Sequence, residues 1–447
     1  MVNVTSELLI KPTLTMALTE KLLHYIWQYQ LFNKQHLKTQ EEQSLQIIQP
    51  GQLNQNQGPD FLSAKIKIDQ TLWVGSVEIH INSSDWITHQ HSQDENYNNV
   101  VLHVVWRDDC KQKLPFATLE IQQLVPKLLL DKYKNLMLNP AFVACENSIA
   151  QTASIVIEKW KERLLVERLE QKAAYIDLLL KKSNGNWEEL SWWVISRHFG
   201  GNVNGESFEQ IAQSIPLTML LKNRHSLFQI EAILFGQSGL LSTEFKDEYP
   251  KKLLQEYIYL KKKYQLRQPK VQLHFLRMRP ANFPTIRIAQ LSLFIHKNDM
   301  ILSKIISTET IQDLKSLFEI EAKDYWHNHY RFDEYSILKL KKMGSQSINN
   351  LLINAIVVLL FAYGLYNHNQ KLKDIAVKWL EDITPEENTI TNGFGQLGIE
   401  TQSAFDSQAF IQLKTKYCDE KKCLACAVGH YVIKPTDAEL LQPMVCH

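Results

Sequence analysis

The chain has 447 residues, of which 45% are hydrophobic and 22% are charged, a composition typical of folded globular proteins. Its 49 basic and 48 acidic residues nearly cancel, which excludes attraction to nucleic acid or membrane through net charge alone. Any contact with nucleic acid must come from a local basic surface. Domains usually have about 100–200 residues, so the length predicts two or three of them.

Targeting and membrane signals are weak along the chain. The N-terminal segment has neither the apolar core of a signal peptide nor an arginine-rich transit pattern, and Met16 is a candidate start because periodic structure begins near it. The longest apolar stretch, 351–363, is shorter than the ~20 residues that span a bilayer, so we expect a buried helix there. Six cysteines are too few for a disulfide scaffold. These features predict a cytoplasmic protein with no membrane partner.

The first third of the chain has the pattern of a sheet with flanking helices. Apolar residues follow helical spacing from Thr19, and alternating or β-branched runs then predict strands. The expected strands cover residues 44–49, 61–68, 72–81, 100–106 and 119–122, and residues 89–99 form a helix or loop. Asp69 and Gln70 would form the turn of a hairpin between the second and third strands.

Beyond about residue 150 the periodicity becomes helical. Helices are expected over 156–181, 187–199, 208–215, 227–235, 249–264, 286–295, 348–366 and 372–380. The sequence therefore predicts a mixed α+β or α/β fold: an N-terminal domain over 16–145 with a mixed sheet flanked by helices, and a larger, mostly helical domain over 146–447 that ends in a cysteine cluster.

Two acids and a histidine form the most informative pattern. Asp60 opens one expected strand, and Glu78 and His80 lie two residues apart on the next, so they share a face. In a hairpin, the start of the first strand lies beside the end of the second. Paired carboxylates in such a place suit Mg²⁺ or Mn²⁺, which can activate water at a phosphodiester. Alternatively, Asp60 caps a turn and the other two lie on a solvated face.

Three further histidines lie close to this pattern in the sequence. His89, His91 and Asp94 could form a second ligand group, because imidazole and carboxylate are common metal ligands. Alternatively, each imidazole hydrogen-bonds the backbone. His103 lies inside an apolar strand, which predicts a core histidine with its hydrogen bonds satisfied.

Residues 18–106 resemble the PD-(D/E)XK nuclease superfamily. The resemblance rests on Pro59-Asp60 and Glu78-Ile79-His80, and on the expected order of a helix, three strands, a helix or loop, and a further strand. The resemblance implies that Asp60 and Glu78 hold the metal ion. His80 replaces the lysine that helps to activate water in that superfamily, so an inactive descendant is the alternative. Glu20 would match the additional helical acid of many members.

Three cysteines, Cys418, Cys423 and Cys426, crowd into nine positions near the C-terminus. Thiolates at this spacing are good ligands for Zn²⁺ or a [4Fe–4S] cluster, and reduced thiols without a metal are the alternative. Candidates for the fourth ligand, in order of preference, are Cys145, then Cys446 and His430, and last Cys110. Cys145 with the three later cysteines resembles the iron–sulfur arrangement of some nucleases in that superfamily, although here Cys145 follows the expected nuclease core.

Basic residues suggest two nucleic-acid contacts. Arg277, Arg279 and Arg287 surround a proline-rich loop before a helix, where they could bind phosphate or pair with acids such as Glu231. Lys261, Lys262 and Lys263 lie in a segment with seven basic residues and one acid, which is either a phosphate-backbone surface or a charged helix face.

The whole chain also resembles an uncharacterised bacterial family of Bacteroidetes type, domain of unknown function 2851. The segments that carry this resemblance are 56–61, 77–80, 84–86, 102–105, 279–284 and 418–426. This family implies no activity.

The acids, the histidines and the nuclease resemblance together give the hypothesis of a divalent-metal-dependent nuclease-like protein that acts on DNA or RNA phosphodiesters. The alternatives are an inactive nucleic-acid or protein-binding module on the same fold, and a histidine-rich metalloenzyme with a small-molecule substrate.

Overall fold

The computed structural model describes residues 18–440 except 111 and 113, and the chain divides into two compact units. The first unit comprises Met1–Ile157 together with Thr415–His447, and the second comprises Glu158–Lys414. The final segment thus belongs, by its contacts, to the unit that contains the sheet. The candidate start Met16 and the candidate ligand Cys446 lie outside the described residues.

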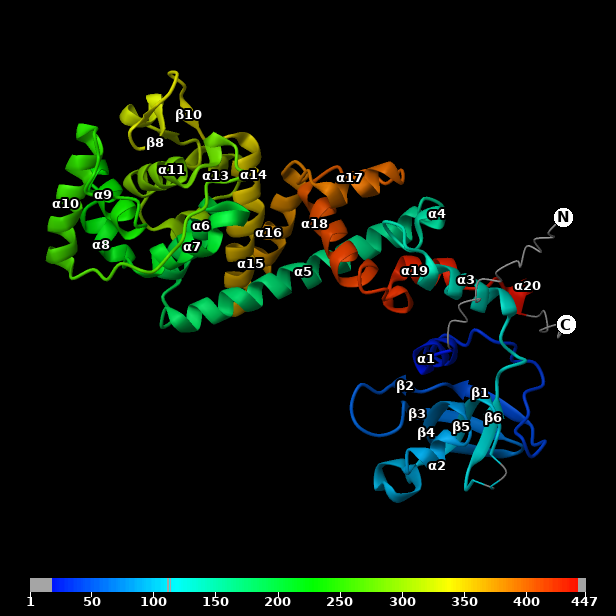
Figure 1. The fold of residues 1–447 in the computed structure, drawn as a ribbon. Helices are drawn as coiled ribbons and strands as arrows, with labels where there is room; N and C mark the ends of the chain where they lie inside the picture. The colour runs from blue at the N-terminus through cyan, green and yellow to red at the C-terminus, as the bar shows by residue number, and fades with distance from the viewer. Residues whose placement is uncertain (1–17, 111, 113, 441–447) are drawn as a thin grey trace, which may run out of the picture. The chain divides into compact units, whose positions relative to one another are not determined.

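The first unit is built on a mixed sheet (Figure 1). Its strands are β1 (Leu45–Gln49), β2 (Gln52–Leu53), β3 (Phe61–Ile68), β4 (Thr71–Asn82), β5 (Val100–Arg107) and β6 (Ala117–Glu120). Their spatial order is β1-β3-β4-β5-β6, and β2 pairs with β3. The β1–β3 and β3–β4 pairs are antiparallel, whereas β4–β5 and β5–β6 are parallel.

Helices and short turns cover this sheet. Thr19 caps α1 (Glu20–Gln28) by accepting from the Leu22 amide, and α1 buries its apolar side against β4. Between β4 and β5 the chain forms α2 (Asp85–Thr88) and the 3₁₀ turns η1 (His91–Gln93) and η2 (Glu95–Tyr97). The remaining elements are α3 (Lys127–Leu138), α4 (Glu146–Ile149), η7 (Cys423–Ala425), α19 (Ala427–Ile433) and α20 (Asp437–Leu440).

The second unit is mainly helical (Figure 1). The long helix α5 (Ser154–Lys182) continues into it from the first unit. Its other helices are α6 (Trp187–Phe199), α7 (Gly201–Gln213), α8 (Leu217–Lys222), α9 (Leu227–Gln237), α10 (Glu248–Tyr264), η3 (Pro280–Asn282), α11 (Pro284–Lys297), α12 (Ile301–Ser307), α13 (Ile311–Leu317), η4 (Asp324–Asn328), α14 (Ser345–Leu351), η5 (Leu352–Ile356), α15 (Val357–Tyr366), α16 (Gln370–Asp382), α17 (Thr389–Gln396) and α18 (Ala404–Leu413). The π-helical η6 (Lys414–Cys418) begins at the last residue of this unit and continues into the first unit. Short strands form two small pairs: β7 (Glu321–Ala322) with β10 (Lys341–Lys342), and β8 (His329–Arg331) with β9 (Glu334–Tyr335).

One continuous helix in this unit has the length and apolar composition of a membrane span. It covers Ser345–Tyr366, including the π-helical turn η5, and 72% of its apolar window is buried inside the structure. Packing in the core of the helical unit therefore explains the apolar composition of this helix. The helix is buried, as the sequence predicted.

The predicted mixed α+β fold class is confirmed. The predicted strand 61–68 coincides with β3, and the predicted helix 187–199 coincides with α6. The segment 89–99, predicted as helix or loop, forms the turns η1 and η2. The predictions omitted α3, α8, α12, α13 and the helices after residue 382.

Candidate metal centre and cysteine cluster

Strand pairing brings Asp60 and Glu78 together. Phe61 pairs with Val77 across β3 and β4, which places the residue before β3 beside the second half of β4. The backbone N–H of Asp60 donates to Glu78 Oε2 at 3.0 Å, and the backbone N–H of Ile79 donates to Asp60 Oδ2 at 3.0 Å. The pairing has an irregularity between Phe61 and Ala64, of the kind that often re-aims side chains beside active sites.

Two imidazoles lie beside the second oxygen of Glu78, and a third lies beside one of them. Glu78 Oε1 lies 3.5 Å from His80 Nε2 and 3.4 Å from His91 Nε2, and His80 Nε2 lies 3.2 Å from His89 Nδ1. The ligand atoms of the three histidines all lie within 4.8 Å of one another. Around a tetrahedral ion with bonds of about 2.0–2.1 Å, neighbouring ligand atoms are about 3.3–3.4 Å apart. The three separations of 3.2–3.5 Å are therefore close to those expected between ligands of a tetrahedral ion.

A further histidine supports His80 from behind. Because β4 and β5 are parallel, His103 is the pairing partner of Glu78, and its Nε2 lies 2.9 Å from His80 Nδ1. This leaves His80 Nε2 directed toward Glu78 and His89. A histidine ligand held through its other ring nitrogen is typical of metal centres. His103 is buried in the core, as predicted. Its hydrogen bonds are not all satisfied, because its Nδ1 has no hydrogen-bond partner in the described chain.

Burial governs the charge of these groups. It raises the pKa of Glu78 to about 8, with the nearby Asp60 carboxylate as the next contribution. Burial, followed by repulsion from neighbouring imidazoles, lowers the pKa of His80 and His103 to about 3. These two imidazoles are thus neutral, the form that binds metal ions. The idea that Glu78 and His80 lie on a solvated face is wrong, because they are 5% and 2% exposed.

Helix α1 contributes two groups to the partly exposed side of the site. His24 Nε2 lies 3.2 Å from Asp60 Oδ2 without hydrogen-bond geometry. Burial, followed by repulsion from Asp60, raises the pKa of Glu20. His24 was not predicted, although it lies one helical turn after Glu20 and so on the same side of α1. In the described chain, the side-chain partners of Asp60 and Glu78 are imidazoles, with no lysine or arginine.

The other predicted members of this site have different positions. Asp94 caps η2, because its Oδ1 accepts from the Asn96 amide at 2.9 Å. His91 stacks on Tyr97 at a centroid distance of 3.9 Å, which fixes its ring. The structure therefore brings together Asp60, Glu78, His80, His89 and His91, with Glu20 near them, and uses Asp94 for a local turn.

The cysteine cluster lies in the first unit, where α19 packs against α3 and α4. Burial and the nearby Cys426 and Cys423 raise the pKa of the Cys145 thiol to about 12, and burial with Cys426 raises that of Cys423 to about 11. These three cysteines are thus neighbours. The loop is tight: a Cβ on Gly429 would lie 2.1 Å from the carbonyl oxygen of Cys423.

The remaining candidates for the cysteine cluster differ in their surroundings. Cys418 ends the π-helical turn η6. His430 Nδ1 lies 2.8 Å from Tyr25 Oη, so this nitrogen is already engaged. The Cys110 thiol follows β5 and donates to the Gln112 carbonyl oxygen at 3.6 Å. Cys145 therefore remains the preferred fourth ligand.

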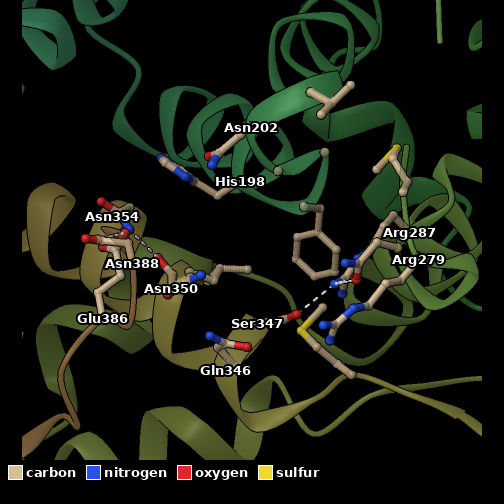
Figure 2. Close-up of a pocket in the computed structure, with 18 of the residues that line it drawn as sticks. His198, Asn202, Arg279, Arg287, Gln346, Ser347, Asn350, Asn354, Glu386 and Asn388 are labelled. Carbon is tan, nitrogen blue, oxygen red and sulfur yellow. Dashed lines mark hydrogen bonds between the residues drawn. The ribbon is translucent and has the colours of Figure 1, made fainter. Parts of the chain in front are cut away.

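The basic candidates lie in the helical unit. Arg277, Arg279 and Arg287 line one cavity, and Figure 2 shows Arg279 and Arg287. Lys261 and Lys263 lie in the last turn of α10 and contact tyrosine rings of the same helix at 5.0–5.9 Å. Three lysines at a helix C-terminus also complement its dipole, which gives them a structural role.

Comparison with known proteins identifies the family of the chain. The model of the family described as "Protein of unknown function (DUF2851)" matches residues 20–389. The chain therefore belongs to the DUF2851 family. No curated protein and no solved structure shows significant similarity to it.

Proposed function

We propose that the protein is a divalent-metal-dependent phosphodiesterase of the nuclease type, with DNA or RNA as substrate. The observation that carries the proposal is the convergence of Asp60 and Glu78 with the three imidazoles of His80, His89 and His91. The order α1, β1, β3, β4, α2, β5 supports it, because this order agrees with the nuclease resemblance of Pro59-Asp60 and Glu78-Ile79-His80.

The donor set favours a transition metal. Imidazole ligands suit Fe²⁺ or Zn²⁺ and a carboxylate ligand suits Mn²⁺, whereas Mg²⁺ prefers a set made of oxygen ligands alone. We assign Glu78, His80, His89 and His91 as ligands, and Mn²⁺ as the first ion to test. A bound divalent ion would supply a nucleophilic water near neutral pH and neutralise charge at the phosphodiester.

The side chains divide into a buried ligand set and a more exposed reactive pair. His80 is buried and is held through Nδ1 by His103, which fits a ligand better than the water-activating role implied by the lysine position. Asp60 and His24 have side chains that are 23% and 22% exposed, so a substrate can reach them. We assign His24 as the general base and Asp60 as the group that orients it.

The test measures Mn²⁺-dependent cleavage of single- and double-stranded DNA and RNA. Asp60→Asn and Glu78→Gln keep the size of each side chain while removing its charge. We expect each to lower the cleavage rate at least 100-fold. Asp131→Ala, an exposed acid on α3 of the same unit, is the control and should cleave like wild type. Unchanged activity in both site variants would reject the proposal.

A small-molecule metalloenzyme is the second candidate, and the three clustered imidazoles favour it. It predicts that Mn²⁺ binds and that Glu78→Gln weakens binding, while no nucleic acid is cleaved. An inactive binding module predicts retention of nucleic acid without cleavage by wild type. The same panel of assays therefore separates the three functions.

We also propose that Cys145, Cys418, Cys423 and Cys426 hold Zn²⁺ or a [4Fe–4S] cluster in a cytoplasmic protein. The proximity of Cys145 to Cys423 and Cys426 supports a shared ion, because thiols from two distant segments of the chain lie near one another. Elemental analysis of anaerobically purified protein distinguishes zinc from iron. Serine at Cys145 and Cys426 should remove the metal, whereas Cys110→Ser should retain it.

A further inference from the structure

The helical unit contains a large polar cavity that the metal centre does not use. Its volume is about 720 Å³, within the range of about 300–1,000 Å³ that is usual for small-molecule sites. Residues of α5, α6, α7, α14 and α18 contribute to its walls, together with the loop before α11. Its described lining includes four arginines and one glutamate, so it favours an anion.

One end of the cavity is built around a buried guanidinium. Arg287 is 8% exposed, and it donates to Asn282 Oδ1 at 2.6 Å, Ser347 Oγ at 2.7 Å and Gln290 Oε1 at 3.0 Å. All three acceptors are neutral. The alternative in which the arginines pair with Glu231 is wrong for Arg287, since Glu231 accepts from the Tyr249 hydroxyl at 2.8 Å.

An anion would complete this arginine end. A buried charge without an opposite charge is costly, and a guanidinium matches the geometry of a phosphate. Arg279 lies beside Arg287 in the cavity wall (Figure 2). Arg277 lines the same cavity. Burial lowers the pKa of Arg287 to about 10, so it remains charged at neutral pH.

The turn between α6 and α7 adds backbone donors. Gly201 has φ of +62°, which permits the sharp turn after α6, and a Cβ on this residue would meet open space. The first turn of the 13-residue helix α7, residues 201–203, lines the cavity. Amides at a helix N-terminus favour negative charge, which adds to the attraction of the arginines.

The opposite end of the cavity is rich in amides and contains its one described acid (Figure 2). Glu386 Oε2 accepts from Gln408 Nε2 at 2.9 Å, and Glu386 Oε1 accepts from Asn388 Nδ2 at 3.3 Å. Asn354 lies in the π-helical turn η5, a distortion that often marks functional sites. Amides and a carboxylate can hydrogen-bond the hydroxyls and base edges of a nucleoside.

We propose that this cavity binds a free mononucleotide, with its phosphate at Arg279 and Arg287 and its ribose and base at the end formed by Asn354, Glu386 and Asn388. The cavity lies within the helical unit, and its lining contains no residue of the metal centre. The proposal therefore holds or fails independently of the nuclease-like activity.

Calorimetric titration of the full-length chain with the four ribonucleoside 5′-monophosphates tests this proposal. At least one should bind, and it should bind at least 10-fold more tightly than its nucleoside or inorganic phosphate. Arg279→Ala should weaken that binding about 10-fold, because a charged hydrogen bond is lost. Asn350→Asp, which adds a negative charge to an exposed residue of the lining, should also weaken it. Arg267→Ala removes an exposed arginine outside the lining and should bind like wild type.

Three results would overturn the proposed mononucleotide site. The proposal fails if folded wild type binds none of the four nucleotides at millimolar concentration. It also fails if Arg279→Ala and Asn350→Asp, shown by circular dichroism to be folded, both bind like wild type. Binding of a 5′-phosphorylated tetranucleotide without binding of any mononucleotide would replace the free-nucleotide site with one for strand ends.

Discussion

The two units of the molecule build their polar sites in different ways. In the first unit, a hairpin register places Asp60 beside Glu78, and strand alternation places His80 on the same face. In the helical unit, the cavity gathers side chains from Arg168 to Ile411, and no short segment contains it. The first site needs few residues at fixed spacing, whereas the second depends on how many helices pack.

Replacing the partly exposed His24 should strongly lower the cleavage rate without removing the ion held by the buried ligands. His24→Gln should lower the rate of Mn²⁺-dependent cleavage about 10²–10⁴-fold, as expected for loss of a general base, while Mn²⁺ affinity stays within about 2-fold of wild type. Single-turnover cleavage and calorimetry measure the two quantities. An equal loss of metal affinity would place His24 among the ligands instead.

A buried acid of the helical unit, Glu231, should make the free energy of unfolding depend on pH, with an effect of similar size. Burial raises the pKa of Glu231 from 4.5 to about 7, so between these values the folded chain retains a proton that the unfolded chain loses. The free energy of unfolding should therefore fall by about 2–3 kcal/mol between pH 5 and pH 8 through this group.

Urea unfolding of wild type and Glu231→Gln at both pH values measures this contribution. The amide cannot ionise, so the variant should lose about 2–3 kcal/mol less than wild type as the pH rises. The same pH dependence in both proteins would show that Glu231 does not titrate with a raised pKa.

A smaller effect tests the support behind the ligands. His103→Phe removes the partner of His80 Nδ1 and should weaken Mn²⁺ binding about 10–100-fold, as is typical when an outer partner of a metal ligand is lost. His36→Ala, an exposed histidine of the same unit, should bind Mn²⁺ like wild type. If His103→Phe bound Mn²⁺ as tightly as wild type, His80 would not need His103 to orient its ring.

The sequence allowed prediction of the hairpin and its acids because their pattern is local. Alternation over 61–68 and 72–81 specifies both strands and the shared face of Glu78 and His80. Neither His24 nor the support of His80 by His103 could be predicted this way. The first depends on how α1 packs on the sheet, and the second on the parallel pairing of β4 with β5.

Local composition also concealed some elements. Helix α17 contains Gly393 and Gly395, which lower helix propensity, yet the capping box formed by Asn388 and Thr391 and the burial of Phe394 stabilise it. The arginine end of the cavity was predicted only as a basic loop, because the cavity also needs walls from distant segments, such as Ser347 of α14, which accepts from Arg287.

Metal titration decides whether Glu78, His80, His89 and His91 hold one divalent ion. Metal-free chain carrying Cys145→Ser and Cys426→Ser, which removes the cysteine site, is titrated with Mn²⁺ by calorimetry. We predict one ion per chain, with an affinity at least 100-fold weaker once His89→Ala and His91→Ala are added. The same stoichiometry and affinity after those two changes, or no binding by the folded chain that retains both histidines, would contradict the account.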